Sequence, residues 1–277
     1  MAALWLMNGA AISSSAALDT IPANWQIVGQ RDFNGDSTHD LLWRDTSSGA
    51  LAIWFLNGTA ITSTAQLATV STAWQVAGTG DFNGDGRGDV LWRNTSTGEV
   101  AVWLLDGASI LSSANLGTVP LNWSIVGAAD FDGDGKADIL WRDTSSGEVV
   151  IWFLNGAAVT STASVATIAT NWQIVATGDF NGDGKADLAW RDVTGETAIW
   201  LLNGAAVSST GVLGVIPSPW AIVETGDFNG DGKADLLWRN TTSGLVSIWF
   251  LSGTQVLAQQ NVATVPTDWT IQNVNVD

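Results

Sequence analysis

The sequence predicts an all-β protein, a β-propeller built from four-stranded antiparallel blades. A nine-residue stretch of the type DFNGDGKAD returns five times, at Asp32, Asp81, Asp130, Asp179 and Asp227, so that successive starts lie 49, 49, 49 and 48 residues apart. Between the copies, short β-branched or aromatic runs alternate with Gly-rich turns, and no window sustains the period of an α-helix. A repeat of this length with four short strands is typical of a propeller blade.

The second repeat shows the elements in order. Residues 74–80 (WQVAGTG) predict a first strand, 81–89 a turn-rich loop, and 90–94 (VLWRN) a second strand. After the polar turn at 95–98, residues 99–107 (EVAVWLLDG) predict a third strand that ends in an Asp-Gly hairpin signal. Residues 108–120 predict a weaker fourth strand closed by a proline. The third strand is almost continuously apolar, which indicates that neighbouring blades cover both of its faces.

We expect one domain over residues 1–277, with repeats at about 23–71, 72–120, 121–169, 170–217 and 218–267. Residues 1–22 match the third and fourth strands of another repeat, and residues 268–277 match a first strand. Because closure of the ring removes exposed strand edges, the sequence predicts six blades, the sixth composed of both termini with the C-terminal strand innermost. That blade lacks a second strand, so either it has three strands or a longer natural chain forms a larger ring.

Composition excludes several classes of function. No apolar run reaches the length of a membrane span, and the absence of Cys excludes disulfides and thiolate chemistry. The net charge of −17 is local, since sixteen of the 27 acidic residues lie in the five loops and the other eleven nearly balance ten basic residues. Without a basic patch to offset phosphate repulsion, nucleic acid is not an expected partner.

The loops have the pattern of a calcium site. Side-chain oxygens stand at the first, third, fifth and ninth positions, a Gly at the sixth allows a sharp turn, and the seventh offers a backbone carbonyl. Several converging carboxylates with no soft donor favour Ca²⁺. The candidate ligands are Asp32, Asn34, Asp36, Thr38 and Asp40; Asp81, Asn83, Asp85, Arg87 and Asp89; Asp130, Asp132, Asp134, Lys136 and Asp138; Asp179, Asn181, Asp183, Lys185 and Asp187; and Asp227, Asn229, Asp231, Lys233 and Asp235.

Two alternatives to a calcium site fit the five loops less well. An EF-hand requires a bidentate Glu at the twelfth position and flanking helices, whereas a Trp stands there in every copy and strands flank the loop. A metal-free loop of Asx-turns explains one copy more easily than five at a fixed period. Ser37 replaces the sixth-position Gly in the first copy. We therefore expect four strong Ca²⁺ sites and a fifth, weaker site near Asp32.

The 17 Trp residues fall into three registers, one in each of the first three strands. Packing between blades accounts for all three, but Trp at the start of the first strand also suits a stacking platform for sugar rings. The candidate ligand-binding residues are Trp25, Trp74, Trp123, Trp172, Trp220 and Trp269. An Arg follows each second-strand Trp, which indicates either a repeated inter-blade ion pair or carbonyl clamp, or a ring of anion sites.

The unit WxIVxxGDFNGDGKADLLWR…GxVxIWLLNG resembles the FG-GAP/VCBS-type repeats of bacterial extracellular proteins and is similar to the calcium-binding blades of integrin α-subunit propellers. The Phe-Gly and Gly-Ala-Pro dipeptides that name the family are absent, and WQIV and LWR stand in their places. The resemblance covers essentially the whole chain. It implies a propeller with Ca²⁺ in the loops between first and second strands, and a role in adhesion, recognition or scaffolding.

These observations predict a non-catalytic, calcium-binding recognition or adhesion module with a glycan or an extracellular protein as ligand. The alternative is a purely structural calcium-stabilised scaffold within a larger surface protein. An enzyme is disfavoured because the chain has one His, no Tyr and no Cys, and because its three Lys residues all lie in the loops. Extracellular modules of this ligand type bind Ca²⁺ with dissociation constants of about 10⁻⁴–10⁻³ M, which predicts a secreted or cell-surface location.

Overall fold

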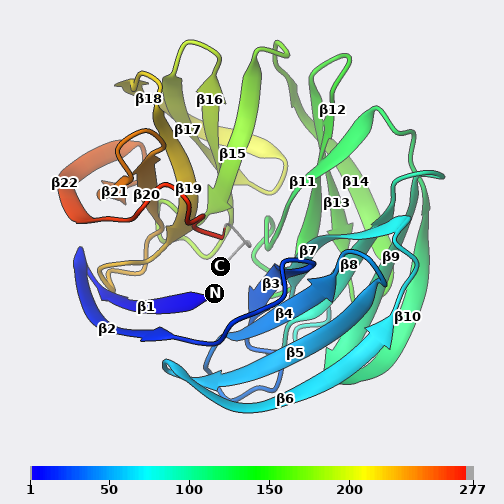
Figure 1. Ribbon diagram of the computed structural model, residues 1–277. Coiled ribbons are helices and arrows are strands. Elements are labelled where there is room, and N and C mark those ends of the chain that lie inside the picture. The colour runs from blue at the N-terminus through cyan, green and yellow to red at the C-terminus, as the bar shows by residue number, and fades with distance from the viewer. Residues whose placement is uncertain (1, 273–277) are drawn as a thin grey trace.

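The computed structural model describes residues 2–272, which form a ring of β-sheets (Figure 1). The 22 strands make five four-stranded antiparallel sheets and one two-stranded sheet, and the described residues contain no helix. The predicted all-β propeller of four-stranded antiparallel blades is therefore confirmed. Residues 2–272 contain no helix that is long and apolar enough to cross a membrane.

The strands follow the repeat order expected from the sequence. The first blade comprises β3 (Trp25–Arg31), β4 (Asp40–Asp45), β5 (Ala50–Asn57) and β6 (Ala60–Thr69); the second β7 (Trp74–Gly80), β8 (Asp89–Asn94), β9 (Glu99–Asp106) and β10 (Ser109–Thr118); the third β11 (Trp123–Ala129), β12 (Asp138–Asp143), β13 (Glu148–Leu154) and β14 (Val159–Thr167). The fourth comprises β15 (Trp172–Gly178), β16 (Asp187–Asp192), β17 (Glu196–Asn203) and β18 (Ala206–Val215), and the fifth β19 (Trp220–Gly226), β20 (Asp235–Asn240), β21 (Leu245–Ser252) and β22 (Gln255–Thr264).

Each blade runs from the centre of the ring outward. The first strands β3, β7, β11, β15 and β19 contact their neighbours around the centre, while fourth strands such as β6, β10 and β22 lie at the perimeter (Figure 1). Backbone hydrogen bonds link each acidic loop to the next, so all five loops lie on one side of the ring.

The hydrophobic core lies between blades rather than within them. One cluster joins Phe82 and Leu91 of the second blade to Ile139 and Trp141 of the third. Second strands are the most deeply buried, and all six residues of β8 are buried. Each second-strand Trp packs against the third-strand Trp beside it, with ring centroids 4.9 to 5.2 Å apart in the five blades. The prediction that neighbouring blades cover both faces of the third strand is confirmed.

The repeated Arg is a carbonyl clamp between blades. In the third blade, the Arg142 guanidinium donates to the carbonyls of Gly147 and Ile168, both at 2.9 Å, and to that of Trp172 at 3.1 Å. Its Cζ also lies 5.0 Å from the ring centroid of Trp190 in the next blade. Equivalent stacking joins Arg44 to Trp92, Arg93 to Trp141 and Arg191 to Trp238.

The prediction of six blades was wrong, because the structure has five four-stranded blades and a separate two-stranded sheet. That sheet consists of β1 (Ala3–Asn8) and β2 (Ala11–Ala17), which supply the third and fourth strands of a repeat as expected. The inner strand expected from residues 268–277 is not formed over 268–272, which adopt turns and irregular structure. Residues 273–277 lie outside the described residues. Residues 2–272 contain no further second strand that could join the two ends into one sheet.

The two-stranded sheet nevertheless occupies the sixth position of the ring. In the second to fifth blades, the hairpin Gly between the third and fourth strands donates to a Phe carbonyl in the acidic loop of the preceding blade, as Gly253 does to Phe180 at 2.7 Å. Gly9, in the β1–β2 hairpin, donates in the same way to Phe228 at 2.7 Å. The hairpin therefore docks on the fifth blade, and Leu6 reaches the Gly58 hairpin of the first blade.

Candidate functional site

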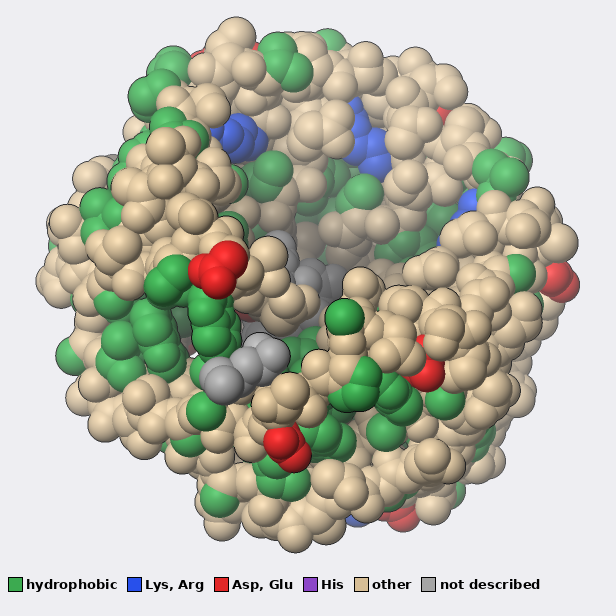
Figure 2. All heavy atoms as spheres, in the orientation of Figure 1, with side chains coloured by type: hydrophobic (Ala, Val, Ile, Leu, Met, Phe, Trp, Pro, Cys, Tyr) green, Lys and Arg blue, Asp and Glu red, His purple; other side chains and the backbone are tan. Residues whose placement is uncertain are grey.

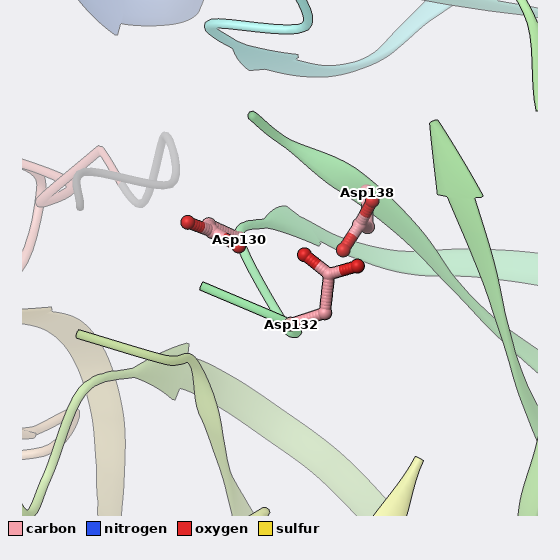
Figure 3. A group of neighbouring side chains, drawn as sticks. All are labelled: Asp130, Asp132 and Asp138. Atoms are coloured by element: carbon pink, nitrogen blue, oxygen red, sulfur yellow. The ribbon is translucent and has the colours of Figure 1, made fainter. Parts of the chain in front are cut away.

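The loop between β11 and β12 gathers three carboxylates. Carboxylate oxygens of Asp130, Asp132 and Asp138 all lie within 4.8 Å of one another (Figure 3). At such separations, like charges repel by roughly 1–4 kcal/mol per pair unless a cation lies among them. The sequence-predicted first, third and ninth positions are therefore brought together as expected.

The first-position Asp organises the turn. Asp130 accepts hydrogen bonds from the Gly133 amide to Oδ1 at 2.7 Å and from the Gly135 amide to Oδ2 at 2.8 Å. Both glycines have a positive φ, +82° and +81°, a conformation that disfavours residues with a Cβ. The sequence DxDGDG therefore wraps its backbone around the Asp130 carboxylate, and the carboxylates of Asp132 and Asp138 lie beside it (Figure 3).

The ninth-position Asp joins the loop to the blade. Asp138 is 1% exposed, and it accepts from the amides of Leu154 at 2.9 Å and Phe131 at 3.1 Å. Burial, with the nearby loop carboxylates, raises the pKa of Asp138 to about 7 despite these hydrogen bonds. The same cause raises the pKa to about 7 in Asp89 and Asp187 and to about 6 in Asp40 and Asp235.

The third position supplies an amide in four of the loops. The Asn83 side-chain nitrogen donates to Asp85 at 3.0 Å, which leaves its oxygen directed to the inside of the loop, where it accepts from the Asp85 amide. In the fourth loop, Oδ1 of Asn181 is buried and has no hydrogen-bond partner among the described residues. A buried acceptor in a loop that also holds Asp179, Asp183 and Asp187 fits an oxygen-coordinated cation, because a cation satisfies both the orphaned oxygen and the charge.

The seventh-position side chains have a role that the sequence did not indicate. In the second to fifth loops this side chain crosses to the preceding loop and covers its fourth-position Gly, as Lys185 covers Gly133 and Lys233 covers Gly182. Arg87 also contacts the Asn34 carbonyl at 3.4 Å and pairs with Asp106 at 3.3 Å. The seventh-position carbonyls remain predicted ligands.

Backbone hydrogen bonds also link successive loops. The eighth-position amide of each loop donates to the first-position carbonyl of the loop before it, at 2.7 Å in all four cases. The donor and acceptor pairs are Gly88 and Asp32, Ala137 and Asp81, Ala186 and Asp130, and Ala234 and Asp179. The sequence contains a signal for this contact, because the eighth residue is Gly or Ala in the four donor loops. A small residue is needed there, since a Cβ on Gly88 would lie 2.5 Å from the Arg31 Cβ.

The first loop keeps the common turn at a conformational cost. Ser37 has a φ of +67° and is the only described residue other than Gly with a positive φ. Its amide still donates to Asp32 at 2.6 Å, as the sixth-position Gly does elsewhere. The Thr38 hydroxyl donates to the Asp36 carboxylate and to the Leu56 carbonyl, the latter at 2.7 Å. The predicted ligand Asp36 is therefore already hydrogen-bonded within the loop.

We expect Ser37→Gly to stabilise the fold by about 1 kcal/mol, because a left-handed backbone costs a residue with a Cβ about that much. Thermal unfolding monitored by circular dichroism measures the change. The matched control is Gly86→Ser, which places the same strain in the second loop and should destabilise by a similar amount. A Ser37→Gly variant no more stable than the parent would contradict the cost assigned to this turn.

The six Trp residues proposed as a stacking platform are neither fully buried nor fully exposed. Trp123 and Trp172 each pack on an inter-blade cluster while part of the indole remains accessible, and the other four are also half-buried. Packing therefore accounts for much of each side chain, and part of each indole remains accessible.

A cavity of about 1050 Å³ lies where the inner part of the sixth blade is missing. Its wall includes Leu4 and Met7 of β1 with Leu237 of the fifth blade, so much of it is apolar. Figure 2 shows the hollow at the centre of the ring, with Lys and Arg side chains on its wall. The repeat pattern indicated that the sixth position lacks a second strand, but it did not predict a cavity there.

Glu224 lines this cavity and breaks the repeat. The equivalent residues in the other blades are Gly29, Gly78, Gly127 and Ala176. A Cβ on Gly29 would lie 2.5 Å from the Thr79 side chain of the next blade, so a small residue is needed wherever a next inner strand abuts. Glu224 stands where no described strand abuts, and burial raises its pKa to about 8. Only Glu224 among the carboxyl groups of the cavity departs from the repeat in this way.

We expect Glu224→Gln to remove a pH-dependent loss of stability. A carboxyl whose pKa rises from 4.5 in the unfolded chain to about 8 binds its proton more tightly when folded, so the free energy of unfolding falls as pH rises through this range. At pH 8.5 the variant should be more stable by about 2 kcal/mol, and near pH 4.5 the two should be equal. Urea unfolding at both pH values tests this, and parallel pH profiles would contradict it.

Comparisons with known proteins agree with the geometry of the ring. A protein-family model described as an FG-GAP-like repeat matches four overlapping stretches, residues 32–92, 81–141, 130–190 and 179–238. Comparison with curated proteins gives no significant match. Among solved structures, a streptogramin B lyase is 9% identical with a TM-score of 0.50, over 87% of this chain and 71% of the lyase, a likeness that concerns the fold alone.

Two further structures are similar at lower scores. The β-propeller domain of Cps50 (Swd1) from Myceliophteria thermophila is 13% identical with a TM-score of 0.47, over 92% of this chain and 74% of that one. The Tc holotoxin pore of Photorhabdus luminescens is 17% identical with a TM-score of 0.39, over 78% of this chain. The match spans only 13% of the toxin chain.

Proposed function

Since the chain belongs to the FG-GAP-like repeat family, we propose that it is a calcium-binding, non-catalytic recognition module that works outside the cell. The observation that carries the proposal is the convergence of carboxylate oxygens within 4.8 Å in the third loop. The other four loops keep Asp at the first, fifth and ninth positions and have Asn at the third. The buried, unpartnered oxygen of Asn181 supports a cation in the fourth loop as well.

In each loop, the first, third, fifth and ninth side chains hold the ion, with the seventh-position carbonyl as a further oxygen. The third loop has the highest charge, because Asp132 replaces the Asn found at the third position elsewhere. Bound Ca²⁺ supplies positive charge that offsets carboxylate repulsion. Asp138 anchors the site to the blade, since its oxygens already bind the amides of Leu154 and Phe131.

The proposal assigns no catalytic residue. Most acidic residues of the chain lie in the five loops. There their carboxylates accept hydrogen bonds from backbone amides, as Asp130 does from Gly133 and Gly135. The sole His, His39, is exposed and lies in the first loop. No combination of nucleophile and base is brought together in the sites described above.

Recognition is assigned to the half-buried Trp residues at the start of the first strands. Trp123 and its five equivalents recur around the ring, so weak contacts at each add up on a surface that carries many copies of a ligand. A glycan is the preferred ligand, because an accessible indole face stacks beneath a sugar ring.

The second candidate is a structural scaffold, and the packing of the same residues favours it. Trp123 lies against the cluster that contains Trp141, and Trp172 against the cluster that contains Trp190. In this case the loops and the indoles serve stability alone, and the ring separates or displays other parts of a surface protein.

The experiment that separates the two is a glycan array probed with the parent chain, with and without chelator, and with Trp123→Phe and Trp172→Phe. Phe fills much of the packed volume but removes the indole edge and N–H. Loss of glycan binding with the melting temperature preserved supports recognition. Absence of binding to glycans and matrix proteins by the parent chain, with Ca²⁺ present, supports the scaffold.

A further inference from the structure

A small pocket lies at the junction of the fourth and fifth blades. Its volume is about 310 Å³. Trp238 forms part of its wall and packs in a cluster with Phe180 and Ile199 of the fourth blade, so the pocket lies on the face of the fifth blade that is turned toward the fourth. The other lining residues are Ile216, Trp220, Ser247, Trp249, Gln259 and Asn261. We call this site the junction pocket.

Strand pairing brings the side chains of the junction pocket together. Trp238 of β20 pairs with Ser247 of β21, and Ser247 pairs with Asn261 of β22. In the neighbouring row, Trp249 pairs with Gln259. Because paired residues of antiparallel strands point to the same face of a sheet, these indoles, hydroxyl and amides share one face. Trp238 and Ser247 are buried and form the floor, whereas Gln259 and Asn261 are exposed and form the rim.

The polar residues of the junction pocket depart from the repeat. The residues that correspond to Ser247 are Ala52, Ala101, Val150 and Ala198. Those that correspond to Gln259 are Thr64, Ser113, Thr162 and Thr210. The fifth blade therefore has a hydroxyl where the others have hydrocarbon, and a long amide where the others have a short hydroxyl. Packing requires neither change, since the other four blades pack without them.

The junction is closed at one end of the pocket. The outer strands β18 and β22 contact each other, and a Cβ on Gly211 would clash with the Cβ of Thr254 in the β21–β22 hairpin. The residues that correspond to Gly211 in the first three blades are Ala65, Ala114 and Ala163. The smaller residue in the fourth blade thus accommodates Thr254. The pocket lies farther along β22, beside the connection that contains Ile216.

The lining has the chemistry of a site for an uncharged sugar. Three indoles supply apolar surface, and the amides of Gln259 and Asn261 supply donors and acceptors. The Ser247 hydroxyl donates to the Gln260 carbonyl at 3.0 Å, so its oxygen remains able to accept a hydrogen bond from a ligand. None of the described residues that line the pocket is charged. Its volume is near the lower end of the roughly 300–1,000 Å³ of small-molecule sites, which suits one sugar ring.

From these observations we infer that the junction pocket binds a single neutral pyranose ring, one per chain. The C–H face of the sugar packs on Trp220 and Trp249, and its hydroxyl groups form hydrogen bonds with Gln259, Asn261 and Ser247. The inference rests on the proposed function, in which the chain recognises a glycan, and adds the site and the stoichiometry. It does not require bound Ca²⁺, because the lining residues lie outside the acidic loops.

The first test is isothermal titration calorimetry with the methyl glycosides of glucose, galactose, mannose and N-acetylglucosamine. We expect at least one of them to bind with one site per chain and a dissociation constant on the order of 1 mM. Binding of several equivalent sugars per chain would overturn the inference, because the polar residues of the pocket occur in one blade. Absence of binding by all four sugars at tens of millimolar would overturn it as well.

Variants of the chain locate the sugar. Gln259→Thr and Ser247→Ala each introduce the residue that three other blades have, so the fold should keep its melting temperature. Each variant should weaken sugar binding about tenfold, because a hydrogen bond to the ligand is lost.

The matched control is Gln260→Ala. Gln260 is adjacent to Gln259 and equally exposed, but it points to the opposite face of β22, and Ala holds its position in the first three blades. This variant should leave both affinity and melting temperature unchanged. Equal effects of Gln259→Thr and Gln260→Ala would overturn the assignment to the junction pocket.

A glycan array separates this inference from the proposed function on which it rests. Loss of array binding by Gln259→Thr supports the pocket, whatever the effect of Trp123→Phe. If Trp123→Phe loses binding while Gln259→Thr retains it, the pocket is overturned and recognition by the other first-strand Trp residues stands. If the parent chain binds neither the array nor the four sugars, both the pocket and the proposed glycan recognition are overturned.

Discussion

Removal of Ca²⁺ by a chelator is expected to lower the melting temperature by roughly 10–20 °C. A site with a dissociation constant of about 10⁻⁴–10⁻³ M contributes about 1.4 kcal/mol at tenfold excess of the ion, and four strong sites contribute roughly 5–6 kcal/mol. Each kcal/mol corresponds to about 2–4 °C for a domain of this size. Differential scanning calorimetry at millimolar Ca²⁺ and in excess chelator measures the difference.

A variant of one loop provides the control for this experiment. Asp130→Asn with Asp132→Asn removes charge from the third loop while its backbone turn is retained. The effect of chelator should then shrink by at least about a quarter, because one of four strong sites is lost and its two neighbours lose a coupled site. An unchanged melting curve in chelator for the parent chain would contradict the assignment of Ca²⁺ to these loops.

Arg142→Lys is expected to destabilise the ring by about 3 kcal/mol. The guanidinium satisfies several carbonyls between two blades and stacks on Trp190, and it is only 3% exposed. A lysine ammonium cannot reproduce this planar set of donors, so buried carbonyls lose their partners. Chemical unfolding at fixed Ca²⁺ concentration gives the difference in free energy.

Arg239→Lys is the matched control, because this residue holds the same position at the open side of the ring. Its contacts are fewer, with hydrogen bonds to Val265 at 3.4 Å and Pro266 at 2.8 Å and no stacked Trp among the described residues. We expect a loss of about 1 kcal/mol. Equal losses in the two variants would show that stacking on Trp190 and the additional carbonyls contribute nothing.

Features within one repeat were predictable from the sequence. The run from Trp74 to Gly80 and the Asp-Gly pair that ends β9 located strands and a hairpin, because their patterns depend on local backbone preference. The convergence of Asp130, Asp132 and Asp138 followed from their spacing around glycines. Five copies of the same pattern made each local inference stronger than one copy would.

Features between repeats were not predictable in the same way. The crossing of Lys185 to Gly133 depends on how two blades pack, and no local pattern encodes that distance. Residues 268–272 do not form the expected inner strand, because the described residues offer no second strand for them to pair with. The number of repeats alone did not predict this outcome. Glu224 was visible in the sequence as a departure from Gly and Ala, but its significance required the cavity beside it.

The hydrogen bonds between successive loops make the five sites a one-directional array with unlike ends. Each of the four bonds runs from one loop to the first-position Asp of the loop before it, from Ala234 back to Asp32. An ion that fixes one Asp therefore also fixes the acceptor used by the next loop. Coupling of this nearest-neighbour kind is described by the same one-dimensional treatment as repeat proteins. Interior loops have two coupled neighbours and terminal loops have one, so ion binding should be cooperative and should begin in the interior of the array.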